Sequence, residues 1–385
     1  MSTLPRLLPS TVAANNLTGR WCAAAGEGSF VASGAGLWPL LALLASAADG
    51  RAREELVAAS GCPAQAGQRA AIELVATLER AAATSAAIGL WVRDGLPLHE
   101  AWTRGLPAGV IDRLAGQGAL DAWAAEHTAG LIERFPLRID PKDVLVLATA
   151  LAAKTSWVER FTAVTLTPES GPWRGHSGPG LFRSTANLDA FSIVGTGSAV
   201  VSRMVVRGVD DLDVHLVVGD GGPSGVLGTG LAALAGELPV RPGSGLAPGA
   251  LAPGLRVHES ESSERGDRVH LSLPPFDIRS AHDLCATPDL FGIRTAMDPT
   301  RGHFPQLSAV PLAISQGAQD VLATFSAEGF EAAAVTAFAM RVAGAMPMRR
   351  KRVRIVRVTF DRPFGFIGVH RPSGLAIVAG WVAEP

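Results

Sequence analysis

The sequence predicts an α+β fold, because helical patterns dominate its first quarter and strand-like runs fill most of the remainder. The two kinds of pattern are segregated along the chain, so they do not predict a parallel sheet built from alternating strand and helix units. The length of 385 residues is above the usual range for one domain, yet large single domains with mixed sheets exist. No internal repeat divides the chain. We therefore expect one domain, residues 1–385.

Three apolar segments early in the chain predict helices. They are Leu37–Ala48, Ala52–Ser60 and Gln68–Thr84. In the third segment, Ile72, Val75 and Leu78 recur at the spacing that places them on one helical face. Each helix should bury that face against the rest of the domain.

Eight runs rich in β-branched and other apolar residues predict strands. They are Ile88–Val92, Val144–Leu151, Ala199–Val206, Val214–Val218, Val269–Leu273, Val321–Phe325, Ile355–Phe360 and Leu375–Ala379. The stretch Gly243–Gly254 is rich in glycine and proline, and we interpret it as an exposed loop within the domain.

The composition excludes several classes of partner and cofactor. The 34 basic and 35 acidic residues nearly cancel, which argues against a nucleic-acid partner for the whole chain. Cys22, Cys62 and Cys285 form neither a metal-type spacing nor an even disulfide framework, so we expect buried or free thiols. The nine histidines show no paired spacing for a metal. The sequence predicts no metal site and no cofactor.

The N-terminal residues lack the charged start and apolar run of a secretory signal. The longest apolar run, Leu37–Ala48, is too short to span a bilayer and contains Pro39. We expect a soluble protein with no membrane partner, cytoplasmic by default.

No constellation of catalytic residues appears. Gly219–Pro223 is similar to the surroundings of a trypsin-like nucleophile, but the serine is missing from its place. The glycines at Gly225, Gly228 and Gly230 do not give the dinucleotide-binding pattern. The sequence therefore predicts that the protein is not an enzyme.

The most informative stretch is Gly329–Ala337, because it fits both a loop and a strand. As a loop it is small and cleavable. As a strand it alternates, with Phe330, Ala332 and Ala334 on one face and Glu331 and Ala333 on the other. The first face is apolar or small enough to be buried in a sheet. A segment that fits both states predicts a switch by strand insertion.

Here the chain resembles the serpin family, and the resemblance covers roughly residues 14–385. Ala318–Phe325 resembles the strand before the reactive-centre hinge, and Val358–Phe366 resembles the strand after the reactive loop. Earlier pieces occur in serpin order. They are Ser29–Ser33 with Leu40–Leu44, the helix signature at Trp123, Thr128, Gly130 and Ile132, the central strand Leu147–Lys154 with Trp157 and Phe161, Leu273–Phe276, and Leu290–Ile293.

The resemblance implies a suicide-substrate inhibitor, acting as a monomer on a serine protease or alternatively a cysteine protease. It implies helices packed on three mixed sheets with an exposed C-terminal reactive-centre loop at about residues 329–354. It also implies a metastable native fold. The hinge that enters the sheet after cleavage would comprise Glu328, Gly329, Phe330, Glu331, Ala332, Ala333 and Ala334. Because serpins often act outside cells, an extracellular location stays open.

Two counts place the scissile bond differently. In the family the cleaved residue lies about fourteen positions after the hinge glycine, roughly 46 Å of extended chain at about 3.3 Å per residue, which gives Ala343 followed by Gly344. A count backward from Phe360 gives Arg352. We favour Ala343, which implies an elastase-like target, whereas Arg341 or Arg352 implies a trypsin-like one. The basic run Arg349–Arg354 also fits a solvated loop or a local anionic contact.

The resemblance assigns four residues to the region where the sheet opens. Ser33, Thr149 and Gln319 would form the shutter, with Gln319 hydrogen-bonding to Thr149, and Trp157 would lie at the breach. The family asparagine and histidine are replaced at Thr149 and Gln319, and a bulky Phe330 stands where a small polar residue is usual. These departures leave an alternative open: a non-inhibitory serpin-like protein that binds or stores a ligand, or is simply a protease substrate.

Overall fold

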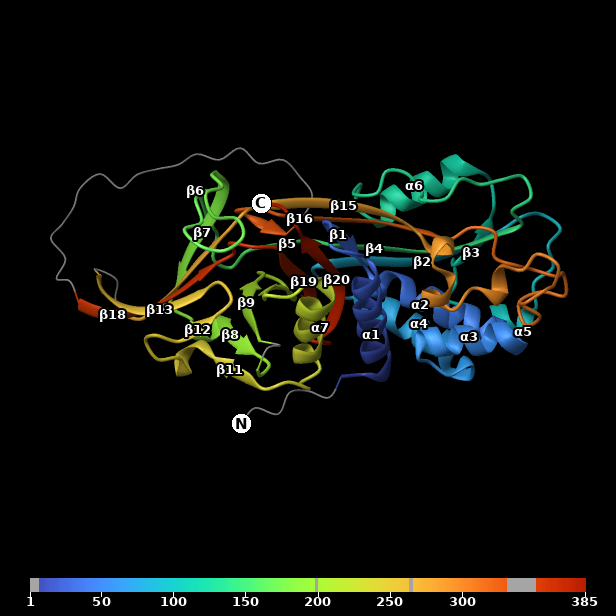
Figure 1. Cartoon of the computed structure of the whole chain (residues 1–385). Helices are drawn as coiled ribbons and strands as arrows, with labels where there is room; N and C mark the ends of the chain where they lie inside the picture. The colour runs from blue at the N-terminus through green and yellow to red at the C-terminus, as the bar shows by residue number, and fades with distance from the viewer. Residues whose placement is uncertain (1–6, 198–199, 263–265, 331–350) are drawn as a thin grey trace.

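The computed structural model describes residues 7–197, 200–262, 266–330 and 351–385. Long strands run between helices α2–α4 on one side and α6 on the other, and a sheet of six strands occupies the opposite end of the molecule (Figure 1). The α-helices are α1 (Pro9–Ala24), α2 (Gly34–Ala47), α3 (Gly50–Ser60), α4 (Ala64–Glu79), α5 (Glu100–Thr103), α6 (Gln117–His127), α7 (Pro223–Leu234) and α8 (Pro288–Phe291). Short 3₁₀ turns occupy Leu188–Ala190, Gly243–Gly245, Leu284–Ala286 and Thr295–Met297.

The three predicted helices are confirmed as α2, α3 and α4. Ser33 caps the N-terminus of helix α2, and its hydroxyl accepts a hydrogen bond from the backbone N–H of Gly36 at 3.0 Å. Helix α4 ends at Glu79, five residues before the predicted end. The carboxylate of Asp211 accepts from the backbone N–H groups of Ala82 and Ala83 and thereby fixes a turn that leads into the next strand. Asp211 is distant in sequence, so the helical pattern alone could not reveal this stop.

All eight predicted strands are present, and the described residues form four hydrogen-bonded sheets. The seven-stranded sheet contains, in spatial order, β1 (Phe30–Ala32), β20 (Leu375–Val382), β19 (Phe364–His370), β10 (Leu212–Val218), β9 (Val201–Arg207), β8 (Phe191–Val194) and β11 (Val240–Pro242). The six-stranded sheet contains β12 (Leu251–Ala252), β13 (Leu255–Ser262), β18 (Lys351–Thr359), β14 (Arg268–Leu273), β7 (Gly178–Thr185) and β6 (Thr162–Leu166).

The remaining strands form two groups. One contains β15 (Phe276–Asp283), β16 (Ala318–Phe325), β17 (Gly329–Phe330) and β5 (Thr155–Ser156), and the other contains β3 (Ile111–Arg113), β2 (Thr84–Val92) and β4 (Leu145–Ala153). Three sheets were expected. The fourth arises because β4 and β16 share no ladder in the described chain, so the expected large sheet is split lengthwise between them. Parallel pairs occur as β14–β18 and β2–β3, and the other recorded strand pairs are antiparallel.

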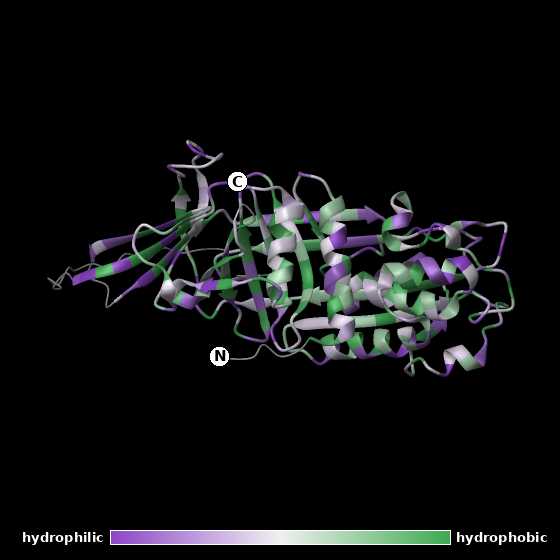
Figure 2. Cartoon of the chain, turned by 60° about the horizontal axis from the view of Figure 1, so that its bottom comes forward, coloured by the Kyte–Doolittle hydropathy of each residue, from purple (hydrophilic) through white to green (hydrophobic). Residues whose placement is uncertain are grey.

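The main hydrophobic core contains residues from both the first helices and the last strands of the chain. Leu17 and Trp38 from the first helices belong to the same buried cluster as Phe325, Phe364 and Ile377 from the last strands. The ring of Phe276 stacks on Phe325 at 5.3 Å between ring centroids. Figure 2 shows apolar colour concentrated among the helices and the strands they cover, with longer hydrophilic stretches on the six-stranded sheet.

The cysteines are free, as expected: Cys22 and Cys62 are buried and Cys285 is half-buried. Among the residues with described positions, no group of three or more acidic, histidine or cysteine side chains is arranged to hold a metal ion. No helix in the described ranges has both the length and the apolar character needed to cross a membrane.

Candidate functional site

The predicted hinge begins as a tight turn between β16 and β17. The backbone N–H of Ser326 donates to the carbonyl of Gly329 at 3.0 Å. The Ser326 hydroxyl accepts from the backbone N–H groups of Glu328 and Gly329, each at 3.3 Å. The turn therefore satisfies its own backbone and reverses the chain directly after β16.

Gly329 is required by a close approach of two backbones. It pairs with Ser156, and a Cβ atom built at position 329 would lie 2.4 Å from the carbonyl oxygen of Thr155. Any side chain here would force β17 away from β5. The backbone contact alone therefore explains why position 329 is a glycine.

Phe330 is already inside the sheet. It pairs with Phe325 on one side and Thr155 on the other, and its side chain is 3% exposed. Its ring lies 6.4 Å from that of Phe366 in the seven-stranded sheet beneath. The bulk of this residue is therefore accommodated before any cleavage.

Trp157, next to β5, holds the same turn through two hydrogen bonds. Its backbone N–H donates to the carbonyl of Glu328 and its indole N–H to the carbonyl of Ser326, both at 2.9 Å. Its ring packs on Phe325 at 4.7 Å, and the side chain is 2% exposed. The expected breach position is thus occupied by a tryptophan that binds the hinge turn directly.

Below Phe330, β4 and β16 are separated by a cavity. Every residue of β4 pairs with β2, and every residue of β16 pairs with β15. Apart from the pairing of Phe325 with Phe330, the facing edges of β4 and β16 therefore lack a ladder partner in the described chain. A cavity of about 470 Å³ lies between these edges, with α2 on one side and α6 on the other. A smaller cavity of about 70 Å³ continues it up to Phe330. We call this space, from Phe330 to Asp143, the slot.

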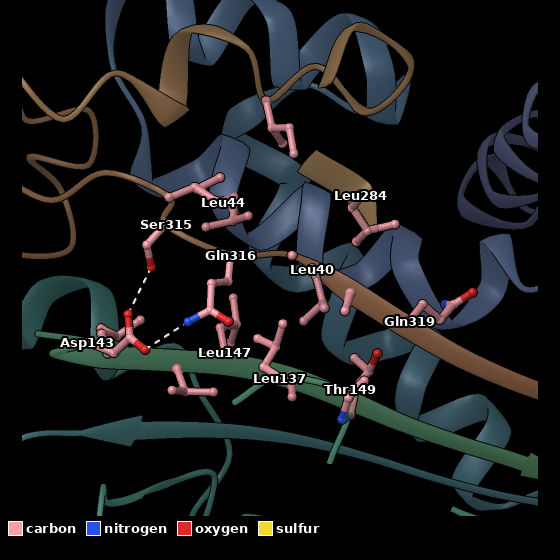
Figure 3. Close-up of a pocket in the computed structure, with 18 of the residues that line it drawn as sticks. Leu40, Leu44, Leu137, Asp143, Leu147, Thr149, Leu284, Ser315, Gln316 and Gln319 are labelled. Atoms are coloured by element: carbon pink, nitrogen blue, oxygen red, sulfur yellow. Dashed lines mark hydrogen bonds between the residues drawn. The ribbon is translucent and has the colours of Figure 1, made fainter. Parts of the chain in front are cut away.

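Two predicted shutter residues, Thr149 of β4 and Gln319 of β16, line the middle of the slot (Figure 3). The side-chain amide of Gln319 accepts from the backbone N–H of Ser33 at 3.2 Å and donates to its carbonyl at 3.0 Å. The Thr149 hydroxyl donates to the carbonyl of Gly36. The Ser33 hydroxyl donates to the carbonyl of Ile377 at 2.6 Å.

The structure brings Ser33, Thr149 and Gln319 together but corrects one detail. We expected Gln319 to hydrogen-bond to Thr149, whereas each binds the first turn of α2 separately. The reason is the slot itself, which holds β4 and β16 apart. Helix α2 therefore links the two halves of the split sheet at this level.

A clasp closes the far end of the slot, as Figure 3 shows. The carboxylate of Asp143 accepts from the Ser315 hydroxyl at 2.9 Å and from the Gln316 amide at 3.1 Å. Gln316 also donates to the carbonyl of Arg138 at 3.0 Å. Sequence reasoning missed these residues, because Asp143 merely precedes a strand and its partners are distant in the chain.

The remaining predicted residues divide into two sets. Outside the described residues lie four hinge positions and three candidates for the scissile bond: Glu331, Ala332, Ala333, Ala334, Arg341, Ala343 and Gly344. Arg352 is described and lies in β18, where it pairs with Glu261 and forms a 3.1 Å ion pair with Glu259. The predicted loop bounds of 329–354 therefore overlap strands β17 and β18 at their two ends.

Arg352 is a poor candidate for the scissile bond. A protease active site takes its substrate as an extended segment whose backbone is available for pairing. The backbone at Arg352 already belongs to the ladder with β13.

Comparisons with known proteins agree with this geometry. The family model described as serpin (serine protease inhibitor) matches residues 252–385, a stretch that includes β13 to β20. A search of curated protein sequences finds no match.

Solved structures match over nearly the whole chain. A cleaved Serpin 42Da has a TM-score of 0.71 at 14% identity and covers 100% of both chains. Thyroxine-binding globulin in complex with thyroxine has a TM-score of 0.70 at 16% identity, covering 98% of this chain and 99% of that one. Native protease nexin-1 with heparin has a TM-score of 0.69 at 16% identity, covering 98% of each chain.

Proposed function

We propose that this chain, which has the serpin fold, inhibits a serine protease by loop cleavage followed by insertion of residues 331–343 into the slot. The observation that carries the proposal is the split sheet. Two facing strand edges without partners flank a cavity, and the hinge already enters its upper end at Phe330.

The register of β17 predicts how the inserted strand would lie. Phe330 pairs with Thr155 and Gly329 with Ser156, both antiparallel. Continued one residue at a time, this register sets Glu331 opposite Lys154 and Thr336 opposite Thr149. It sets Ala343 opposite Lys142, directly beyond the clasp. The favoured scissile residue would thus reach the far end of the slot.

The two faces of the segment suit the two sides of the slot. Residues sharing the face of Phe330 would point to the side of Leu147, Thr149 and Leu151, which pack towards α2 and the main core. The opposite face would point to the side of Val146 and Ala148, which pack towards α6. The first face is apolar or hydroxylated, and it carries no charge up to Met340.

Insertion would convert two unpaired strand edges into a continuous sheet. An inserted strand of about nine residues would pair with both edges, and each net hydrogen bond contributes roughly 0.5–1.5 kcal/mol, which offsets a backbone ordering cost of roughly 1–2 kcal/mol per residue. Burial of the small apolar side chains adds to the gain from these hydrogen bonds. The uncleaved protein would therefore be trapped in a less stable state until the loop is cut.

The covalent step would use the protease's own chemistry. Its serine oxygen would attack the carbonyl carbon of Ala343 and form an ester. The bond to the Gly344 nitrogen would break, and the serine proton would leave on that nitrogen by way of the protease's base. This chain would contribute the substrate and the strand but no catalytic group.

The experiment is incubation with pancreatic elastase, followed by a denaturing gel, mass spectrometry of the fragments and a melting scan. A complex that survives denaturation, with cleavage after Ala343 and a large rise in Tm, supports the proposal. Thr336→Arg should turn the inhibitor into a substrate, because it would bury a charge among apolar side chains. Ala337→Ser, on the opposite face, is the matched control and should remain inhibitory.

The alternative is a non-inhibitory protein of the same fold. Thyroxine-binding globulin, a structural neighbour, is described in complex with thyroxine, so this fold also occurs in a ligand-binding protein. Cleavage with neither a complex nor a rise in Tm would favour this alternative. Cleavage with a rise in Tm but no complex would mean that insertion occurs too slowly to trap the protease.

A further inference from the structure

Five basic side chains occupy one face of the six-stranded sheet in two adjacent rows. In the first row, Arg357 of β18 pairs with Arg256 of β13 and His270 of β14. In the second row, two residues along the strands, Ile355 separates His258 from Arg268. Residues directly opposite in a sheet share a face, so these rows form a compact grid. We call the five basic residues the cationic face.

The cationic face points away from the core. The alternate residues of the same strands are buried at 0–3% exposure: Val257, Val269, Leu271, Val356 and Val358. Arg256 and Arg357 are exposed, and the other three basic residues are half-buried. Ile355, between His258 and Arg268, is 3% exposed, so the first row is the part of the grid that is open at the surface, on an element whose opposite side is fixed by core packing.

This charge pattern is costly for the fold. Like charges directly opposite each other on neighbouring strands destabilise a sheet. The described carboxylates nearby do not offset the charges of Arg256 and Arg357, because Glu259 pairs with Arg352 and Asp267 with Arg354, which alternate with Arg357 on the opposite face. Burial, followed by the charges of Arg357, Arg256 and His270, holds the pKa of His258 below its ordinary value.

Two nitrogen atoms of the cationic face lack partners. Nδ1 of His258 and Nε of Arg268 are buried and make no hydrogen bond within the described chain. Buried polar atoms in folded proteins are nearly always paired. Both atoms lie in the second row, beside Ile355, so the unmet hydrogen-bonding capacity lies two residues along the strands from Arg256 and Arg357.

We propose that the cationic face is a binding site for a ligand with two or more linked phosphate groups. One guanidinium fork can satisfy a carboxylate, which has two oxygens and one charge. A phosphate carries three oxygens and up to two charges, and so suits two adjacent guanidinium groups such as Arg256 and Arg357. A second phosphate would reach Arg268, roughly 7 Å away along the strand direction.

The test is titration calorimetry of the intact, uncleaved protein with sodium tripolyphosphate at pH 7 and low salt. The double variant Arg256→Gln/Arg357→Gln should bind about tenfold more weakly or worse, as expected when charge-assisted contacts are removed. Arg352→Gln is the matched control, because it removes one charge from the same strand on the opposite face. Equal affinities of the wild type and the double variant would overturn the proposal.

Two further measurements sharpen the result. A bound anion favours protonation of His258, which lies near His270, Arg256 and Arg357, whereas protonation of the terminal phosphates weakens binding to every variant alike. The ratio of the wild-type affinity to that of His258→Gln should therefore rise as the pH falls from 8 to 6.5. Dextran sulfate and polyglutamate replace tripolyphosphate in parallel titrations. Stronger binding of either polymer than of tripolyphosphate, at equal charge concentration, would reject phosphate as the ligand chemistry. Because no protease is involved, failure here leaves the inhibitory function untouched.

Discussion

The indole N–H of Trp157 donates to the carbonyl oxygen of Ser326 at 2.9 Å, across the top of the split sheet. Trp157 directly follows β5 and Ser326 directly follows β16. The bond therefore joins the two halves of the sheet at the level where the hinge enters. Below this level the start of α2 links the halves in the middle of the slot, and the Asp143 clasp joins them at the far end.

Replacing Trp157 with phenylalanine should loosen the top of the slot. The variant keeps an aromatic ring against Phe325 but leaves the carbonyl of half-buried Ser326 without the indole donor, which typically costs about 1 kcal/mol. Urea unfolding followed by circular dichroism measures the loss. Trp173→Phe is the control, because the indole of Trp173 makes no hydrogen bond with any described residue, although its ring also packs on a phenylalanine. Equal losses in both variants would contradict the assigned role.

Gly329→Ala should displace β17 from β5. The new Cβ atom would lie 2.4 Å from a backbone oxygen, and backbone cannot move aside as a flexible side chain can. We expect a loss of about 1–3 kcal/mol in the free energy of unfolding, as for other overpacked sites. Gly225→Ala is the control, since this helical glycine faces open space and alanine favours a helix by about 1 kcal/mol. A neutral Gly329→Ala would show that β17 is not held as described.

Sequence patterns were sufficient where local periodicity decides the structure. Helix α3 and strand β10 were predicted because apolar spacing and β-branched runs are local signals. The resemblance located Ser33 and Gln319, and the structure places them in contact. The end of α4 was missed because it depends on Asp211, more than a hundred residues away.

The slot itself could not be predicted from the sequence. Strands β4 and β16 were both expected, but nothing in either run indicates that their facing edges lack partners. The clasp was missed for a related reason, since Asp143, Ser315 and Gln316 belong to no recognisable motif. Such features depend on which segments the complete fold brings together.

Asp143→Ala should open the far end of the slot. The change removes the acceptor of Ser315, of Gln316 and of the Asp140 backbone N–H, and because these bonds are exposed we expect a loss of about 1–2 kcal/mol. The uncleaved variant should melt at a lower temperature. Asp94→Ala is the control, because the ion pair of Asp94 with Arg113 is exposed on both sides and typically contributes less than about 1 kcal/mol. Indistinguishable melting of the two variants would refute the clasp.

Cys22 should be the least reactive of the three thiols. Burial raises the pKa of Cys22 to about 12, and it also raises the pKa of Cys62 and of Cys285. A raised thiol pKa means less thiolate at a given pH, and the thiolate is the reactive form. At pH 8 the native protein should show no reaction at Cys22 with Ellman's reagent, whereas unfolding in guanidinium should expose all three thiols. Rapid labelling of native Cys22 would show that its surroundings open readily.

Phe330→Thr tests whether the hinge has already entered the sheet. If the ring were an obstacle still outside, threonine would ease insertion and leave the uncleaved protein unchanged. Because Phe330 is 3% exposed and packs beside Phe366, we instead expect the uncleaved variant to lose about 2–4 kcal/mol through the cavity and the buried hydroxyl. Val164→Thr, on a 38% exposed side chain, is the control and should change stability little. An uncleaved Phe330→Thr variant as stable as the wild type would place this ring outside the core, and the upper end of the slot would then be open.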